Sequence, residues 1–213
     1  MLSTIYETRS QNQNPRRGVD VKDEGFWDWF HDNADAIVAN YDDEKLIEQL
    51  DTKVAMAWPK LSWEMGPDIS GDWYFALSPN LDKRNSEIAT KAINSAPNIQ
   101  GWVFYDTRQR KSWSGCFELL TGRGTVKIDS STWEYVLLRY PDGECEIFLI
   151  GDEANLFDED ERWKAAAIVV EGLLGEKIIL DNDLSFTLSN APEPQFRGRQ
   201  KPIQDLPRAF GFE

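Results

Sequence analysis

The spacing of apolar residues changes from a helical to a strand period along this chain, and that change limits its fold more than any other feature. Between residues 26 and 58, apolar side chains recur every three or four positions, which is typical of helices with one buried face. Between residues 61 and 77 they alternate with polar neighbours, as in strands with one buried face. The chain must therefore pack amphipathic helices against a sheet, and we expect an α+β fold.

Two helices are predicted at the start of this region. In the first, Phe26, Phe30 and Ile37 share one face. The second covers residues 42–58 and ends before Pro59, which cannot donate a helical hydrogen bond.

Two ββαβ-like units follow, and we expect them to form a mixed or mainly antiparallel sheet. The first has strands near residues 61–65 and 72–78, a short helix at 82–96 and a strand at 101–107. In the second, strands at 132–140 and 144–150 flank the turn signal Pro141-Asp142-Gly143. A helix at 158–175 comes next, and we interpret 176–189 as a return to strand. The similar intervals between Trp73 and Cys145, Ala92 and Ala166, and Trp102 and Ile178 indicate a duplicated architecture.

Composition shifts divide the chain into four segments. Residues 1–22 are polar and rich in Asn and Gln, and we expect a flexible leader. Residues 23–110 hold the two helices and the first ββαβ unit, and residues 111–190 hold the second unit, which we expect in the same globule. Residues 191–213 are rich in proline and arginine, and we expect an extended basic tail.

The overall charge limits the partners of this chain. Its 213 residues carry a net charge of −14, together with 41% hydrophobic residues and nine tryptophans, so the body should fold. Nucleic acids and anionic membranes are themselves polyanions and bind through basic side chains. We therefore expect a basic protein partner, no nucleic acid and no membrane.

The cysteines and the first residues indicate the compartment. Cys116 and Cys145 form no CxxC pair, so neither a zinc site nor a disulfide framework is predicted. The first residues lack the apolar core of a secretory signal, and no stretch approaches the roughly 18 apolar residues of a membrane helix. We expect a cytoplasmic protein with reduced thiols.

The stretch "FWDWFHDNADAIV", residues 26–38, allows two interpretations. It places four aromatic rings, the chain's single histidine and three aspartates in thirteen positions. One interpretation is an aromatic pocket in which His31 acts as an acid, a base or a ligand. The other is the packed face of an amphipathic helix with His31 at its edge, and the periodicity favours it.

Catalytic and metal-binding motifs are not evident. With one histidine, a His-rich metal site is impossible, and a Ser-His or Cys-His system would have to use His31. "TGRGTV" at 121–126 lacks the glycine pattern of a phosphate loop, and "GDEANLFDEDE" at 151–161 lacks the ligand spacing of a calcium loop. We expect no catalytic residue, no metal and no cofactor, while an active site made of carboxylates alone stays open.

Acidic residues occur in two long runs. Residues 23–44 hold eight and residues 141–161 hold nine, and neither run contains Lys or Arg. Such runs are often solvated surfaces, but a negative field also speeds encounter with a basic partner and supplies carboxylates for arginine. Exposed tryptophans would anchor the contact. The predicted partner-binding residues are Asp152, Glu153, Asp158, Glu159 and Asp160, with Asp32 and Asp35 as a second patch.

One set of short motifs resembles a recurrent pattern in uncharacterised bacterial proteins. Residues 26–106 contain an aromatic helix start "FWDWF", "WEMG", "WYFALSP" and "APNIQGW", and "EGLLGE" at 171–176 is similar to a later part of the pattern. The resemblance covers about half of the chain. Such proteins occur in toxin-immunity neighbourhoods, so the resemblance implies a non-enzymatic cytoplasmic role in neutralising a toxin. It transfers no catalytic residue, and the basic C-terminal tail has no counterpart in the pattern.

The sequence therefore favours an acidic binding protein that acts as an immunity-like or antitoxin-like inhibitor by covering a basic surface of its partner. Two alternatives stay open. One is an accessory subunit that joins a larger complex through its aromatic and tail segments. The other is an enzyme that uses paired carboxylates.

Overall fold

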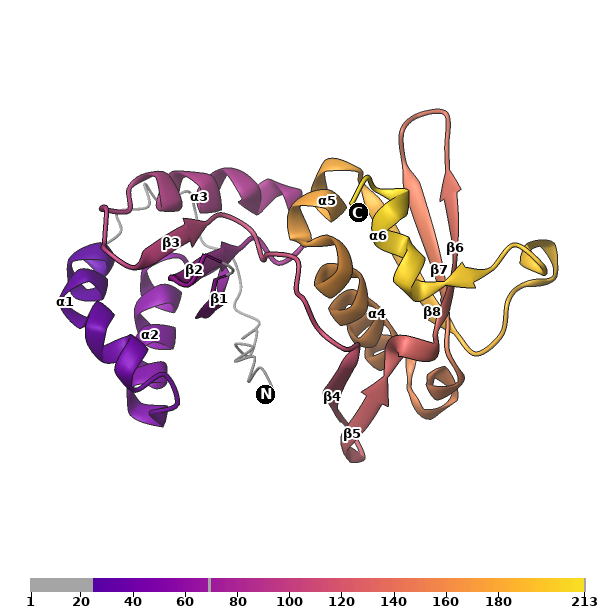
Figure 1. Ribbon diagram of the computed structural model, residues 1–213, viewed down its shortest axis with the longest axis horizontal. Coiled ribbons are helices and arrows are strands. Elements are labelled where there is room, and N and C mark those ends of the chain that lie inside the picture. Colours follow the sequence, from indigo (N-terminus) through magenta and orange to yellow (C-terminus); the bar gives the residue numbers. More distant parts are fainter. Residues whose placement is uncertain (1–24, 69, 213) are drawn as a thin grey trace. The chain divides into compact units, whose positions relative to one another are not determined.

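The computed structural model describes residues 25–68 and 70–212. The chain divides after Arg108 into two compact units (Figure 1). Each unit combines helices with a small sheet, which confirms the α+β class. The predicted leader, residues 1–22, lies outside the described residues.

The first unit has the element order predicted from its sequence. Helix α2 begins after Asp43, whose carboxylate accepts hydrogen bonds from the backbone N–H groups of Lys45 and Leu46, and it ends just before Pro59. The elements of this unit are α1 (Phe26–Ala39), α2 (Glu44–Ala57), β1 (Ser62–Pro67), β2 (Trp73–Ser78), α3 (Lys83–Asn94) and β3 (Trp102–Tyr105).

The sheet of the first unit has the order β1-β2-β3. Strands β1 and β2 are antiparallel, with Trp63 opposite Leu77. Helix α3 then leads to β3, which runs parallel to β2 with Trp73 opposite Trp102. Because side chains alternate across a strand, Trp63 and Phe75 are buried on one face together with residues of the three helices.

The aromatic start of α1 forms the core of the first unit. Phe26, Trp27 and Phe30 are at most 4% exposed. Phe30 lies 5.1 Å from Phe75 between ring centroids, and the Trp27 indole N–H donates to the Ala92 carbonyl at 3.2 Å. The packing interpretation of residues 26–38 is therefore confirmed.

The opposite face of the same sheet carries polar side chains. Glu64 is only 3% exposed and accepts a hydrogen bond of 2.6 Å from the Tyr74 hydroxyl. Burial, followed by the negative charge of Glu64, raises the pKa of Tyr74 well above its ordinary value. The Tyr74 hydroxyl therefore stays protonated and donates its hydrogen bond to the buried Glu64 side chain.

The second unit begins with a hairpin and continues with a second ββαβ arrangement. Residues 116–129, for which no element was predicted, form strands β4 and β5. The turn at Pro141-Asp142-Gly143 joins β6 to β7 as predicted. The strands and longer helices are β4 (Cys116–Thr121), β5 (Gly124–Asp129), β6 (Glu134–Arg139), β7 (Cys145–Ile150), α4 (Glu159–Leu174), α5 (Glu176–Asp181), β8 (Leu184–Ser189), β9 (Lys201–Pro202) and α6 (Leu206–Ala209). Short 3-10 turns cover Ser130–Thr132, Asp152–Leu156, Pro194–Phe196 and Ile203–Asp205.

The two larger sheets repeat one topology. In the second unit β6 and β7 are antiparallel, and a helical connection leads to β8, which runs parallel to β7. Strand β8 therefore corresponds to β3. The expected match of Trp102 with Ile178 is wrong, because residues 176–181 form helix α5 rather than strand. Gly175, at φ 76°, separates α5 from α4, and the short run "KIIL" fits either period.

The predicted extended tail is wrong for the described residues. We call residues 191–212 the C-terminal strap. Its strand β9 pairs with β6, placing Lys201 opposite Tyr135. Phe196 lies 4.6 Å from Phe148 between ring centroids, and Ile203 is 3% exposed. These apolar side chains, spaced between prolines and arginines, hold the segment against its sheet.

We expect Leu206→Ala to lower the free energy of unfolding by about 2–5 kcal/mol, because it would leave a cavity in a packed site. Leu206 is 0% exposed and belongs to the strap. Urea unfolding followed by circular dichroism measures the change. Arg197→Ala, at an exposed position of the same segment, serves as the control and should stay within about 0.5 kcal/mol of the native value. Equal stability of the two variants would contradict a packed strap.

Candidate functional site

Helix α1 presents a row of carboxylates on its outer face. Asp28, Asp32 and Asp35 are exposed and follow one another at spacings of four and three, so they lie along one side of the helix. The buried Phe30 and Ile37 occupy the other side. The Asp32 carboxylate lies 3.6 Å from the His31 ring nitrogen, and both side chains are exposed. We call Asp28, Asp32 and Asp35 the acidic stripe.

The acidic stripe ends at a shallow pocket within the first unit. The pocket has a volume of about 410 Å³, which is within the usual range for ligand sites. Its residues come from the last turns of α1 and from the two loops that precede β2 and β3. We call it the Trp73 pocket; it is lined by Asp35, Val38, Ala39, Gly71, Asp72, Trp73, Gln100, Gly101 and Trp102.

Parallel pairing brings these two loops together. Because β2 and β3 run in the same direction, their first residues, Trp73 and Trp102, meet at one edge of the sheet. The backbone N–H of Trp73 donates to the Gly101 carbonyl at 2.9 Å. Gly71 at φ 93° and Gly101 at φ 80° adopt the left-handed region, which glycine enters without strain. The loops can thus turn sharply beside the pocket.

Aromatic rings form one wall of the Trp73 pocket. The Trp73 ring is partly exposed and lies 6.1 Å from that of Trp102 and 5.6 Å from that of Tyr41, measured between centroids. Trp102 in turn lies 4.9 Å from Phe30 in the core. This chain of contacts ties the Trp73 side chain to the buried face of α1.

The Trp73 pocket combines negative charge with an accessible aromatic face. Asp35 on α1 and Asp72 before β2 are both exposed and both line it. An arginine or lysine side chain is attracted to carboxylates, and a cation over a tryptophan ring gains about 0.5–1 kcal/mol at an exposed site. The pocket is therefore suited to a basic side chain or an organic cation. Among the described residues, no three His, Cys, Asp or Glu side chains are grouped so that they could hold a metal ion.

Two of the predicted acidic contacts in the second unit have partners inside the fold. The Trp133 indole N–H donates to Glu153 at 3.0 Å. Asp158 caps α4 by accepting from the Glu161 backbone N–H at 2.9 Å, while its own N–H donates to the Glu161 carboxylate. These contacts explain the two carboxylates as structural groups.

The other three predicted residues of this segment, Asp152, Glu159 and Asp160, are exposed. Between them and the rest of the unit, the Arg162 Nε donates to the carbonyls of Ala154 and Phe157 at 3.0 and 3.2 Å. We call Asp152, Glu153 and Asp158–Asp160 the acidic segment. It belongs to the second unit, whereas Asp32 and Asp35 belong to the first.

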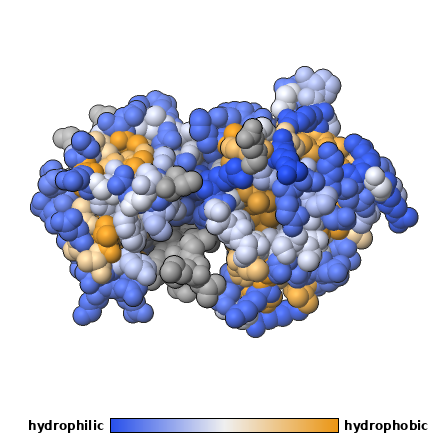
Figure 2. Space-filling model, in the orientation of Figure 1, coloured by the Kyte–Doolittle hydropathy of each residue, from blue (hydrophilic) through white to orange (hydrophobic). Residues whose placement is uncertain are grey.

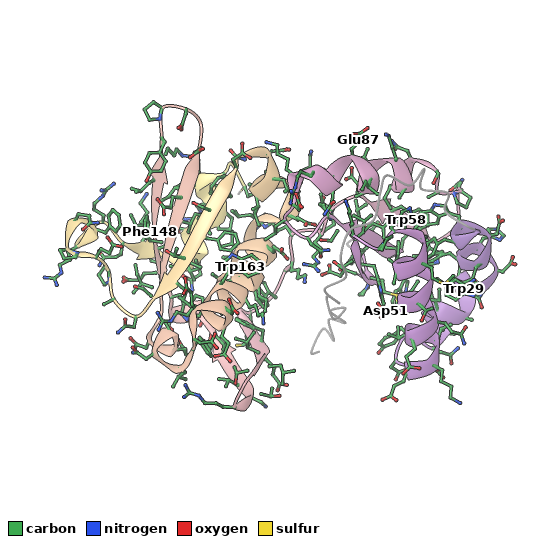
Figure 3. The ribbon with its side chains drawn as sticks, turned by 180° about the vertical axis from the view of Figure 1, so that it is seen from behind. Trp29, Asp51, Trp58, Glu87, Phe148 and Trp163 are labelled. Carbon is green, nitrogen blue, oxygen red and sulfur yellow. The ribbon has the colours of Figure 1, made fainter. Side chains whose placement is uncertain are left out.

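The surface of both units is mostly hydrophilic on the face drawn in Figure 2, with apolar residues in separate smaller groups. Single large apolar side chains are nevertheless exposed. Trp163 projects from α4 near the acidic segment (Figure 3), is 51% exposed, and stacks on Phe186 with 6.1 Å between centroids. Tyr41 beside Trp73 is 47% exposed. Each unit thus places an exposed aromatic ring near carboxylates.

Asp35 was predicted from the sequence as a partner-binding residue, whereas the other residues of the pocket were not predicted. Trp73 fitted the apolar period of a strand, and Asp72 and Gly101 belonged to unremarkable turns. The available signal was the ββαβ order, since a strand–helix–strand connection makes two strands parallel and brings their starting loops together.

Comparisons with protein-family models, curated proteins and solved structures found no match for this chain. The resemblance to bacterial proteins of toxin-immunity neighbourhoods therefore stays a prediction. Within residues 25–68 and 70–212, no helix has the length and apolar character needed to cross a membrane.

We expect Gly101→Ala to lower the free energy of unfolding of the first unit by about 1–2 kcal/mol, because a side chain is strained at positive φ. A Cβ at this position would meet no atom within 4 Å, so the backbone alone accounts for the effect. Tryptophan fluorescence during urea unfolding measures it. Gln100→Ala, at the exposed neighbouring position, should change stability by less than about 0.5 kcal/mol. If both variants match the native protein, the turn does not require glycine.

Proposed function

We propose that this protein binds a basic protein partner through the Trp73 pocket and the acidic stripe, and that it inhibits this partner by covering its basic surface, as an immunity or antitoxin protein in the cytoplasm does. The observation that carries the proposal is the arrangement of Asp35 and Asp72 around the accessible Trp73 ring in one pocket. The two carboxylates attract a cation, and the Trp73 ring gives it a surface to stack on.

Long-range attraction precedes the contact. The net charge of −14 raises the rate at which a basic protein meets this chain, and salt weakens that effect. The carboxylates of the acidic stripe repel one another along α1. A basic partner bound beside them relieves this repulsion. The partner's functional surface is then blocked by occlusion, without any chemical step.

An arginine side chain of the partner is the best occupant of the Trp73 pocket. Its planar guanidinium stacks on an indole ring and donates several hydrogen bonds at once to nearby carboxylates. In interfaces, a few such anchored residues contribute most of the binding free energy. Asp35 and Asp72 line the pocket from two different elements, so both contribute negative charge to a guanidinium bound there.

The acidic segment of the second unit supplies additional charge in this proposal. Asp152, Glu159 and Asp160 are exposed, and the neighbouring Trp163 offers a second aromatic surface. Glu153 and Asp158 contribute their charge from positions fixed by Trp133 and by the start of α4.

The accessory-subunit alternative is weakened by one observation. That hypothesis uses the C-terminal tail to join a larger complex, but Phe196, Ile203 and Leu206 of the strap are already buried within the second unit. The strap therefore has few apolar side chains left for another protein. A carboxylate-based enzyme stays an alternative that no particular group of residues favours.

The test compares two variants that lose the same charge. Asp35→Asn with Asp72→Asn neutralises the Trp73 pocket, and Asp42→Asn with Glu48→Gln neutralises two exposed carboxylates of the same unit that belong neither to the pocket nor to the acidic stripe. The ligand is a peptide of alternating arginine and glycine, and its affinity is measured by calorimetry at low and high salt. We expect the pocket variant to lose about tenfold in affinity, or about 1.4 kcal/mol.

The control variant should lose no more than about threefold, because it only reduces the general field. Equal losses in the two variants would show that the peptide responds to net charge and not to the pocket. Unchanged affinity in both would remove the first unit from the proposed interface.

A further inference from the structure

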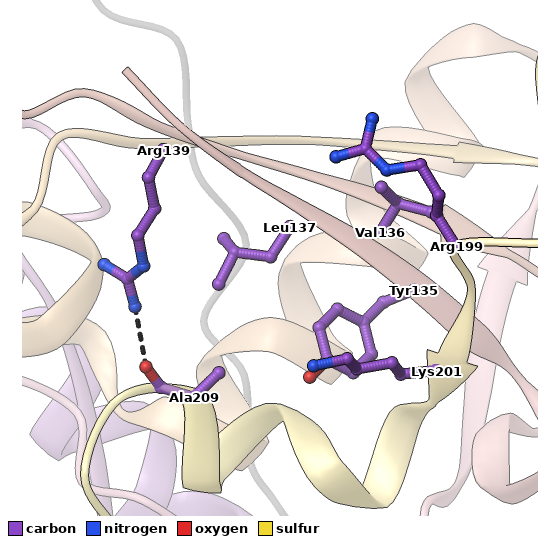
Figure 4. Close-up of a pocket in the computed structure, with 7 residues that line it drawn as sticks. All are labelled: Tyr135, Val136, Leu137, Arg139, Arg199, Lys201 and Ala209. Carbon is purple, nitrogen blue, oxygen red and sulfur yellow. Dashed lines mark hydrogen bonds between the residues drawn. The ribbon is translucent and has the colours of Figure 1, made fainter. Parts of the chain in front are cut away.

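The second unit contains a pocket of the opposite charge. It has a volume of about 380 Å³ and lies along β6, between β9 and the end of α6 (Figure 4). Three of its residues are basic and none is acidic, in a chain whose net charge is −14. We call it the β6 pocket; it is lined by Tyr135, Val136, Leu137, Arg139, Arg199, Lys201 and Ala209.

The pocket forms because the strap pairs with only the first residues of β6 and then turns away from the strand. Strand β9 pairs with Glu134 and Tyr135 only, so the rest of the β6 edge is not paired with another described strand. An open strand edge presents backbone N–H groups that can donate to a ligand. The pairing also places Lys201 directly beside Tyr135.

Arg139 is held in position by the strap. Its Nη2 donates to the Ala209 carbonyl at 2.6 Å, and its guanidinium lies 4.9 Å from the centre of the Phe210 ring. Its Nη1 also donates to the Cys145 sulfur at 3.6 Å. A guanidinium has five N–H donors, so these two hydrogen bonds leave others for a ligand. The positive charge is thus fixed before a ligand arrives, which reduces the entropy lost on binding.

Tyr135 adds a neutral donor. It is 2% exposed, and burial, followed by the charge of Asp205, raises the pKa of its hydroxyl, so the phenol stays protonated at neutral pH. Asp205 lies 3.3 Å from Arg208, and this ion pair reduces its effect on the pocket. Figure 4 shows Tyr135, Lys201 and Arg139 on the side of β6 toward α6, whereas Arg199 lies across the strand from them, with its guanidinium 5.8 Å from the centre of the Phe196 ring.

Basic side chains gathered without a carboxylate among them repel one another, and a bound anion relieves that repulsion. The apolar side chains of Leu137 and Ala209 also line the cavity. We propose that the β6 pocket binds a small organic anion, with a phosphate or carboxylate group between Arg139 and Lys201 and an apolar body against Leu137. This site is independent of the proposed contact with a basic partner, because it lies in the other unit and has the opposite charge.

The experiment uses the full chain and three probes: phenyl phosphate, benzoate and inorganic phosphate. Calorimetry or ligand-detected NMR gives the affinity of each. We expect saturable binding of phenyl phosphate or benzoate at millimolar concentrations and weaker binding of inorganic phosphate, which lacks the apolar body. The stronger of the two aromatic probes identifies the preferred anionic group.

Lys201→Gln with Arg199→Gln removes two charges at exposed positions of the pocket and keeps Arg139, which also holds the strap. We expect at least about a tenfold loss in affinity for the stronger probe. Arg123→Gln with Lys127→Gln, exposed on the β4–β5 hairpin of the same unit, is the control and should change affinity by less than about twofold. Binding of none of the probes, or equal losses in both variants, would overturn the proposal.

Discussion

The candidate site of this protein depends on the burial of the α1 aromatic rings against the sheet of the first unit. Phe30 contacts Phe75 and Trp102 with centroid distances of 5.1 and 4.9 Å. Contacts of this kind contribute about 0.5–1.5 kcal/mol each beyond the area that they bury. They fix the rotation of α1 about its axis, and the same rotation directs Asp35 to the pocket. The aromatic residues at the start of α1, which allowed a functional interpretation in the sequence, therefore act through packing.

The two units share a topology but differ in the charge of their pockets. In each, an antiparallel hairpin is followed by a helical connection and a parallel strand. The first unit uses the edge where β2 and β3 begin, and there it gathers carboxylates. In the second, the strap covers part of β6 and brings arginine and lysine to it. Two sheets of the same topology thus carry pockets of opposite charge, because the segments added to them differ.

Local periodicity predicted most elements of both units, because helices such as α1 and α2 are long enough to show one apolar face. It failed for residues 176–181, where four apolar or amphipathic positions fit both periods. The packing of the strap was not predicted, because its proline and arginine content is typical of an extended tail, although Phe196 and Leu206 indicate burial. Charge predicted Asp35 as a surface residue, but Asp72 becomes its neighbour in the pocket only through the packing of α1 on the sheet, which no local pattern contains.

Recognition of a basic side chain by Trp73 is tested most directly by fluorine NMR of the full chain labelled with fluorotryptophan and titrated with an arginine-rich peptide. The Trp73 signal is assigned from Trp73→Phe, and we expect a saturable shift of this resonance. The signals of Trp27 and Trp63, which are 4% and 1% exposed, should stay in place. Peptide binding that leaves the Trp73 resonance unmoved would contradict recognition of a basic side chain by this ring and its neighbouring carboxylates.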